Sequence, residues 1–155
     1  MSRVPHVLLV DGYDQDRAYY AQRLKYSLPD FVVVEAPTGR DGLALCSFRK
    51  IDCVILEIDL PDMSGFEALV RLVPVVRHPE IAVIVLTRLT NQNLLNLATK
   101  NGAQAALQKT VTSGDVLDQV VLKVIANVNS EKEKRKSHRD DSSPRPPAFF
   151  RMSAS

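Results

Sequence analysis

Apolar residues in this chain alternate between short continuous runs and longer segments in which they recur at helical spacing. The continuous runs are rich in β-branched residues and typical of buried strands; they cover residues 6–10, 31–36, 53–56, 81–86 and 103–108. Between them, apolar residues three or four positions apart predict helices over residues 14–28, 39–48, 65–77, 91–100 and 112–128. Five strands alternating with five helices predict an α/β fold, a doubly wound five-stranded parallel sheet with helices on both faces.

Local signals mark several of the predicted helix ends. Asp14 and Thr38 are the expected N-caps of the helices that they begin or precede. Pro74 is expected to kink the third helix or to end it early, because proline cannot donate the helical hydrogen bond. Gly102 is the expected C-cap of the fourth helix.

The composition changes near the end of the chain, which divides the sequence into two predicted parts. Residues 131–139 are a mixed-charge run, and residues 140–155 contain serines, three prolines and Phe149-Phe150. Such a segment has too little apolar surface to bury and is expected to be disordered. We predict a domain over residues 1–130 and a disordered, charged, proline-containing tail over residues 131–155. The tail is either an inert solubilising end or a short linear motif anchored by the two phenylalanines.

The net charge is unevenly distributed between these parts. Of the 20 basic and 18 acidic residues, the predicted tail holds seven and four, which leaves 13 and 14 for the predicted domain. The pI of 8.6 therefore reflects the tail and does not indicate a nucleic-acid-binding domain. No run reaches the roughly 18 apolar residues of a membrane span, and the N-terminus lacks a cleavable signal, so we expect a cytoplasmic protein without a membrane partner. Cys46 and Cys53 lack metal-ligand spacing and are expected to be reduced thiols.

Polar side chains directly follow four of the five predicted strands. They are Asp11 after the first strand, Glu57 and Asp59 after the third, Thr87 after the fourth and Lys109 after the fifth. The carboxyl ends of parallel strands share one edge of the sheet, where ligands bind. Carboxylates there can hold Mg²⁺ or accept a phosphoryl group, while a hydroxyl and an ammonium can bind the phosphoryl oxygens. The set predicts a phosphoryl site; the alternative is a static salt-bridge cluster of Glu57, Asp59 and Lys109.

A longer pattern of residues surrounds these strand ends. It comprises Val10-Asp11, Glu57 four residues before Pro61 and ahead of Met63-Ser64-Gly65, Thr87, and Lys109 after Gly102-Ala103. With this pattern, residues 4–128 resemble the receiver domain of the two-component response-regulator family. The resemblance implies a flavodoxin-like sheet with strand order 2-1-3-4-5. It also implies that Glu57 occupies the phosphoacceptor position and that Asp11, Thr87 and Lys109 line the pocket around it.

Four positions depart from the pattern of that family. The acceptor is normally aspartate, not Glu57, and the second acid of the strand-one pair is replaced by Gly12. Ala106 stands where the family has an aromatic switch residue, and Thr110 where a proline follows the lysine. The extra methylene of glutamate moves the carboxylate outward by about 1.5 Å, toward direct contact with Lys109. Positioning errors of about 1 Å can already cost about 10²-fold in rate.

The same departures bear on the metal and on the switch. The remaining candidate metal ligands are Asp11, Glu57 and Asp59, one acid fewer than the family provides, so Mg²⁺ is expected to bind weakly or not at all. No other cofactor is expected. Without an aromatic ring at Ala106, the two-state element that the family uses for activation is missing.

These expectations combine into a pseudo-receiver, a stand-alone signalling protein of a two-component phosphorelay that is not an enzyme. It would act as a phosphorylation-independent protein-interaction module. The resemblance implies a protein partner, either a histidine kinase or a downstream signalling protein, on the surface of helix 91–100, strand 103–108 and helix 112–128. Helix 91–100 carries Leu94, Leu95 and Leu97, more leucines than its buried face requires. One of them is therefore expected to be exposed and to contact the partner. A homodimer stays open, and no nucleic-acid partner is expected.

Two other functions stay open at this point. A still phosphorylatable response regulator would use Asp59 or Glu57 as its acceptor. A small phosphatase of the haloacid-dehalogenase type needs an acid two residues after its nucleophile, whereas Asp11 and Asp14 are three residues apart.

Arg88, beside the predicted pocket, either shields the site or pairs with Glu57, or it is a solvated loop residue.

Overall fold

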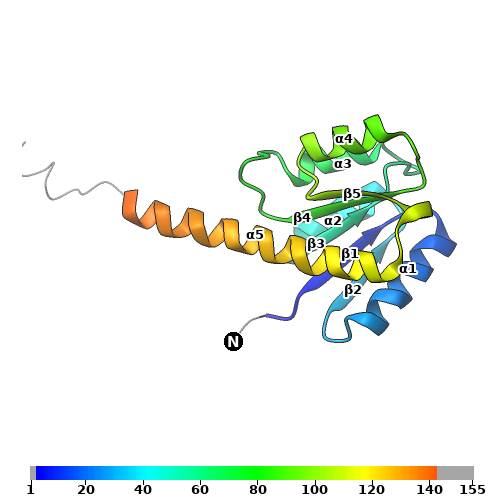
Figure 1. The fold of residues 1–155 in the computed structure, drawn as a ribbon, viewed down its shortest axis with the longest axis horizontal. Helices are drawn as coiled ribbons and strands as arrows, with labels where there is room; N and C mark the ends of the chain where they lie inside the picture. The colour runs from blue at the N-terminus through cyan, green and yellow to red at the C-terminus, as the bar shows by residue number, and fades with distance from the viewer. Residues whose placement is uncertain (1–2, 143–155) are drawn as a thin grey trace, which may run out of the picture.

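A five-stranded parallel sheet forms the centre of the molecule (Figure 1). The computed structural model describes the backbone of residues 3–142 and the side chains of residues 3–138. The strands are β1 (His6–Val10), β2 (Val32–Ala36), β3 (Cys53–Leu56), β4 (Ala82–Thr87) and β5 (Ala105–Gln108). They lie in the order β2-β1-β3-β4-β5, and each neighbouring pair is parallel. The predicted fold class and strand order are confirmed.

Helices cover both faces of this sheet. They are α1 (Asp14–Ser27), α2 (Gly39–Phe48), α3 (Gly65–Leu72), α4 (Gln92–Lys100), the short 3₁₀ helix η1 (Lys109–Val111) and α5 (Gly114–Ser142). On one face, Leu9 of β1 packs in a core with Leu24 of α1 and Leu117 of α5. On the other face, Leu8 packs in a second core with Leu69 of α3, and residues of α2 and α4 join it. Burial of both faces explains why the strands are continuous apolar runs.

The predicted helix ends are partly correct. Thr38 caps α2, because its side chain accepts a hydrogen bond from the backbone N–H of Asp41. Helix α3 ends at Leu72, just before Pro74, as expected for an early stop. Asp14 is the first residue of α1 and not its cap; Tyr13 is the N-cap and makes no side-chain cap hydrogen bond. The C-cap of α4 is Asn101 and not the predicted Gly102, which follows it with a φ of +111°, a conformation that favours glycine.

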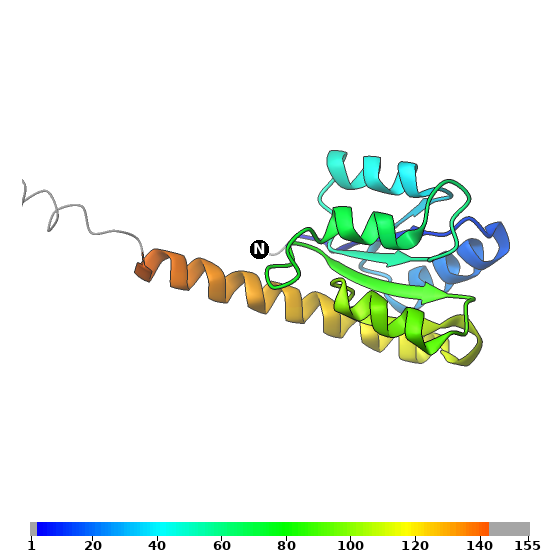
Figure 2. The ribbon, with the colours of Figure 1, turned by 90° about the horizontal axis from the view of Figure 1, so that it is seen from above.

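Helix α5 is longer than the sequence pattern predicted. It continues to Ser142, so the prediction of disorder from residue 131 is wrong for residues 131–142. The remainder of the predicted tail, residues 143–155, lies outside the described residues. The mixed-charge run consists mainly of glutamate, lysine and arginine, which are strong helix formers, and the next proline is Pro144. Figures 1 and 2 show the C-terminal part of α5 projecting beyond the sheet.

A tertiary contact holds the first turns of this extension. The guanidinium of Arg135 donates a 3.0 Å hydrogen bond to the carbonyl oxygen of Pro79 and pairs with the Glu80 carboxylate at 3.2 Å. Both partners lie in the loop that leads into β4.

No helix of the described residues combines the length and the apolar character of a bilayer span.

The loop after β3 is held tightly against the strand end. A Cβ atom at Gly65 would lie 2.5 Å from the carbonyl oxygen of Glu57, so only glycine permits this close approach of α3. The Gly65 N–H also donates a 2.7 Å hydrogen bond to the carbonyl oxygen of Ile58. The start of α3 therefore holds the backbone at Glu57 and Ile58 in place.

Candidate functional site

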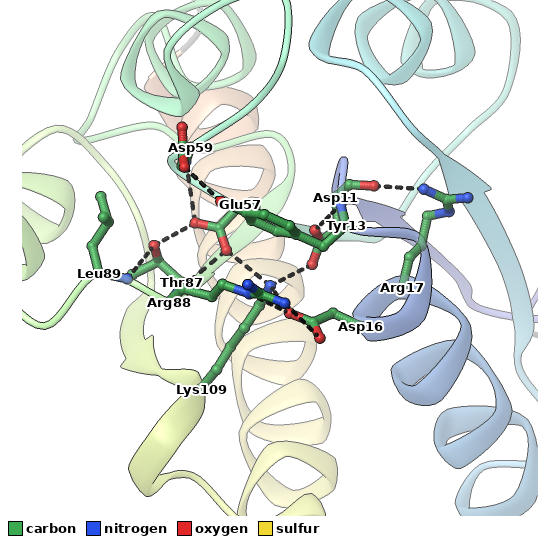
Figure 3. Close-up of polar contacts among 10 residues, drawn as sticks. All are labelled: Asp11, Tyr13, Asp16, Arg17, Glu57, Asp59, Thr87, Arg88, Leu89 and Lys109. Atoms are coloured by element: carbon green, nitrogen blue, oxygen red, sulfur yellow. Dashed lines mark hydrogen bonds and ion pairs between the residues drawn. The ribbon is translucent and has the colours of Figure 1, made fainter.

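The four predicted strand-end residues converge at the carboxyl edge of the sheet (Figure 3). Asp11 follows β1, Glu57 follows β3, Thr87 ends β4, and Lys109 begins η1 after β5. Their side chains are connected by hydrogen bonds and ion pairs, and all four are buried or nearly so. The predicted convergence at one edge is thus present.

The carboxylate of Glu57 is surrounded by donors. Its Oε1 accepts hydrogen bonds from the Thr87 hydroxyl and from the backbone N–H of Asp59, the latter at 3.1 Å. Its Oε2 accepts from the backbone N–H of Arg88 at 3.1 Å and pairs with the Lys109 ammonium at 2.9 Å. The Glu57 residue is only 1% exposed, so these four donors replace the water that a carboxylate would otherwise bind. The contact between Glu57 and Lys109 that the extra methylene predicted is present.

Lys109 bridges three carboxylates. Its Nζ lies 2.7 Å from Asp11 Oδ2, 2.9 Å from Asp16 Oδ2 and 2.9 Å from Glu57 Oε2. Burial alone would lower the pKa of Lys109, but the hydrogen bonds to these carboxylates outweigh burial and raise the pKa above its usual value. The ammonium is therefore a permanent charge at the centre of the site.

The pKa of Asp11 reflects both its burial and its contact with Lys109. Burial raises its pKa above 3.8, and the hydrogen bonds from Lys109 and from the backbone N–H of Tyr13 offset only part of this rise. Lys109 is thus the main group that favours the ionised form of Asp11 against the effect of burial.

A second group of side chains lies over the solvent side of the site, and we call it the cover: Tyr13, Asp16, Asp59 and Arg88. The Arg88 guanidinium pairs with Asp16 at 2.9 Å and lies 3.9 Å from the centre of the Tyr13 ring. The Tyr13 hydroxyl donates a 2.6 Å hydrogen bond to Asp59. Figure 3 shows this chain of contacts spanning from α1 to the loops after β3 and β4.

The cover corrects two expectations. Asp59 was predicted to line the pocket, but its side chain is exposed and accepts a hydrogen bond from the Tyr13 hydroxyl. Only its backbone N–H faces Glu57. Arg88 shields the site but does so by pairing with Asp16; its contact with Glu57 is through the backbone.

Asp16 and the role of Tyr13 were missed in the sequence. Asp16 is one of two acids in the first turn of α1, and either could have been assigned to capping or to a solvated face. The usable signal was position: the first turn of a helix that follows β1 lies at the carboxyl edge, beside Asp11. The pKa of Asp16 is lowered, first by its hydrogen bond from Arg88 and also by Lys109.

Comparison with known proteins agrees with this geometry. The family profile of the response regulator receiver domain matches residues 7–121. The chain belongs to this family. A two-component response regulator of Oryza sativa subsp. japonica, ORR5, is 31% identical over 113 residues, which cover 72% of this chain and 83% of that protein. Receiver domains are signalling modules that interact with histidine kinases or other proteins.

Solved receiver structures resemble the chain as well. The signal receiver domain of a LuxO-type protein from Vibrio parahaemolyticus superposes with a TM-score of 0.75 at 26% identity, over 84% of this chain and 96% of that one. A CheY-like receiver domain protein from Methanospirillum hungatei JF-1 has a TM-score of 0.70 at 23% identity, over 85% and 99% of the two chains. The second likeness supports the fold alone.

Two further positions of this receiver domain were singled out by the sequence. Ala106 lies on β5, opposite Val85 in the sheet, and packs against the core on the α2–α4 side with no ring to move. Asp14, the acid that a phosphatase would need, is 83% exposed and pairs with Arg17 at 2.9 Å.

The geometry does not suit a Mg²⁺ ion, which members of the receiver family typically bind at this edge. The Lys109 ammonium sits between the carboxylates of Asp11 and Glu57, where a second cation would be repelled. Position 12 has no carboxylate, and even a Cβ atom there would lie 2.7 Å from Pro61 Cδ. In the part of the chain that the structure describes, no group of three or more acidic, histidine or cysteine side chains is arranged to hold a metal.

The cover makes a testable prediction about Tyr13. Its pKa is raised above 10.0, mainly because the phenol donates a hydrogen bond to the Asp59 carboxylate. Asp59→Asn should lower this pKa toward the ordinary value, measured by an NMR pH titration of labelled tyrosines. Asp62→Asn, which removes another exposed acid of the same loop, should leave it unchanged. An unchanged Tyr13 pKa in Asp59→Asn would contradict the cover.

Proposed function

We propose that this receiver domain works as a pseudo-receiver, a phosphorylation-independent protein-interaction module of a two-component pathway. The observation that carries the proposal is the environment of Glu57. Its two carboxylate oxygens accept hydrogen bonds from the Thr87 hydroxyl and from two backbone N–H groups, and they pair with the Lys109 ammonium. In a phosphoryl site the hydroxyl and the ammonium are the groups that would bind the phosphoryl oxygens. Glu57 thus fills the pocket with its own negative charge.

The nucleophilic reaction is disfavoured by the same contacts. An attacking carboxylate needs a free lone pair in line with the donor phosphorus, but both oxygens of Glu57 already accept hydrogen bonds and face inward. A phosphodonor would also have to displace the cover, which lies between solvent and Glu57. The Lys109 ammonium offsets part of the negative charge of Asp11, Asp16 and Glu57, a role that a metal ion would otherwise share.

The alternative acceptor is Asp59, which is exposed and reachable from solvent. Among the described side chains, Asp59 has no cation paired with it to bind the phosphoryl oxygens, because the Lys109 ammonium is paired with three other carboxylates. Its own side chain accepts a hydrogen bond from the Tyr13 hydroxyl. A still phosphorylatable regulator is therefore the second candidate function. The phosphatase alternative finds no support, since the Asp14 side chain is exposed and paired with Arg17.

The partner surface that we propose is the face of α4, β5 and α5. Of the three leucines of α4, Leu95 is buried, Leu94 packs against the core and Leu97 is 44% exposed. Val111 and Val116, at the start of the α5 region, are also exposed. These apolar side chains fit a histidine kinase, a downstream signalling protein or a second copy of the chain, in a cytoplasmic setting.

Added Mg²⁺ tests the metal side of this proposal. A ligand present at a hundredfold its Kd would stabilise the folded protein by about 2.7 kcal/mol. We expect no Mg²⁺-specific stabilisation in chemical unfolding at millimolar MgCl₂, compared with NaCl at the same ionic strength. A stabilisation by Mg²⁺ that Asp11→Asn removes would contradict the proposal.

A further inference from the structure

The end of the molecule opposite Glu57 has its own surface features. It is the amino edge of the sheet, where the loops before β3 and β4 lie beside the C-terminal ends of α2 and α3. A hollow of about 510 Å³ opens there. Its floor includes Leu43, Ile51 and Ile81, and its rim carries Arg49, Lys50 and Arg71. An apolar floor with a basic rim suits a ligand that is apolar in the middle and acidic at its flanks.

Two more hollows lie where α5 passes this edge, on either side of the contact between Arg135 and Pro79. The larger, of about 430 Å³, is lined by residues that include Val76, Arg77 and Lys134. The smaller, of about 240 Å³, is lined by Glu80 and three cations, Lys132, Arg135 and Lys136. The extension of α5 therefore forms one wall of a basic recess and is not simply a helix in solvent.

The charge of this end is strongly one-sided. The linings of the three hollows together hold eight cations and two carboxylates. Among the residues with described side chains, the ion pairs of these cations are the exposed pair Arg71–Glu67 and the pair Arg135–Glu80. The acids of the Glu57 site and its cover lie at the opposite, carboxyl edge. The cations at the amino edge therefore favour a negatively charged partner there.

Exposed apolar side chains accompany these cations. Phe48, at the end of α2, is 86% exposed, and Val75 and Val76, in the loop after α3, are 52% and 48% exposed. Phosphate backbones would gain nothing from these side chains, whereas an acidic peptide with an apolar residue would bury them. The same side chains would suit an anionic bilayer, but α5 projects past this edge and would hold a flat surface away from the hollows (Figures 1 and 2).

We propose that the amino edge, formed by the ends of α2 and α3, the loop before β4 and the extension of α5, binds an acidic protein segment that carries an apolar anchor residue. The segment lies in the angle between α5 and the sheet edge, its anchor in a hollow and its carboxylates on the surrounding lysines and arginines. This surface is separate from the α4–β5–α5 face. It also does not depend on Glu57, so it would operate whether or not the domain is phosphorylated.

A synthetic peptide with a Leu-Phe pair between runs of glutamate is the probe. We expect it to bind the full chain with an affinity that falls as salt is raised, and to shift amide NMR signals of the loop before β4 and of residues 130–136. Arg49→Gln/Lys132→Gln, one change at the 510 Å³ hollow and one on α5, should weaken binding roughly five- to tenfold. The matched control Arg40→Gln/Lys123→Gln removes the same charge from exposed sites outside the hollows and should change affinity less than twofold.

Four results would overturn the proposal. The first is equal weakening of peptide binding by the two double variants, and the second is NMR shifts confined to the α4–β5–α5 face. The third is equal binding of the same peptide with glutamine in place of glutamate. The fourth is tighter binding of duplex DNA or of phosphatidylserine vesicles that the peptide does not displace. The two proposals fail independently, because the peptide titration reports on the amino edge and the phosphorylation experiment reports on Glu57 and Asp59.

Discussion

Lys109→Met should cost about 3–5 kcal/mol of folding free energy, because it removes the one cation that three carboxylates share in the pocket. Methionine retains most of the apolar stem of lysine, so the loss is of charge and not of volume. The side chains of Lys109, Asp11 and Glu57 are at most 6% exposed, so water cannot replace the ammonium without opening the pocket. Urea unfolding at pH 7 measures the change.

The pH dependence of this variant distinguishes charge loss from poor packing. In the wild type the folded-state pKa of Lys109 is raised above 10.5. Lys109 therefore contributes its full stabilisation of the folded state below pH 10.5 and loses it as the pH rises through the folded-state pKa. The pKa of Asp11 is already raised and should rise further without its cation. An acid whose folded pKa exceeds its unfolded value of 3.8 favours folding as the pH falls through that raised pKa. The deficit of Lys109→Met should therefore shrink between pH 7 and about pH 4, whereas a packing defect would persist.

The matched control is Lys123→Met, which makes the same replacement at an exposed position of α5. It should change stability by less than about 0.5 kcal/mol. A loss below about 1 kcal/mol in Lys109→Met would mean that the three carboxylates are stable without the lysine, and the ion cluster would not be the organising feature of the site.

Glu57→Gln is expected to cost roughly 2–4 kcal/mol although it preserves the shape of the side chain. The amide can present an oxygen to the Thr87 hydroxyl and to the N–H of Asp59, which satisfies one side. Its NH₂ group then faces the N–H of Arg88 and the Lys109 ammonium, so two donors lose their acceptor. Flipping the amide would let the Thr87 hydroxyl accept from the NH₂ group but would leave the Asp59 N–H without its acceptor, so at least one donor is unpaired in either orientation.

Glu67→Gln provides the comparison, because it neutralises an exposed glutamate whose partner is Arg71 on the same helix. That change should cost no more than about 0.5 kcal/mol. Chemical unfolding of both variants, with unchanged m-values, would attribute the difference to the pocket. Equal stability of Glu57→Gln and the wild type would show that the four donors find other partners.

The fold followed from the sequence because its signals agree. Runs such as 81–86 are apolar throughout, as a strand buried on both faces requires. Thr38 lies at the N-terminus of α2 and Pro74 just after the C-terminus of α3, which agrees with the helix ends that the apolar spacing predicts. The convergence of Asp11, Glu57, Thr87 and Lys109 followed from parallel strands alone, since their carboxyl ends share an edge. The contact of Glu57 with Lys109 followed from one extra methylene.

What escaped the sequence depends on side-chain directions and on local competition. Asp59 was assigned to the pocket by spacing, but its carboxylate bonds to Tyr13 outside it. Asp16 and Arg88 meet only because α1 and the loop after β4 lie side by side, which no short-range pattern reports. The continuation of α5 was missed because a mixed-charge run serves equally as a helix or as a disordered tail, and its contact through Arg135 is tertiary.

The central claim is that Glu57 fills the pocket and is not phosphorylated. The most direct measurement is incubation of the full chain with acetyl phosphate and Mg²⁺, followed by intact-protein and tandem mass spectrometry, beside a receiver domain that retains the acidic pair and the acceptor aspartate. We predict no phosphoryl adduct on this chain under conditions in which that receiver is labelled. A hydroxylamine-sensitive phosphoryl group on Glu57 or Asp59 would contradict the account.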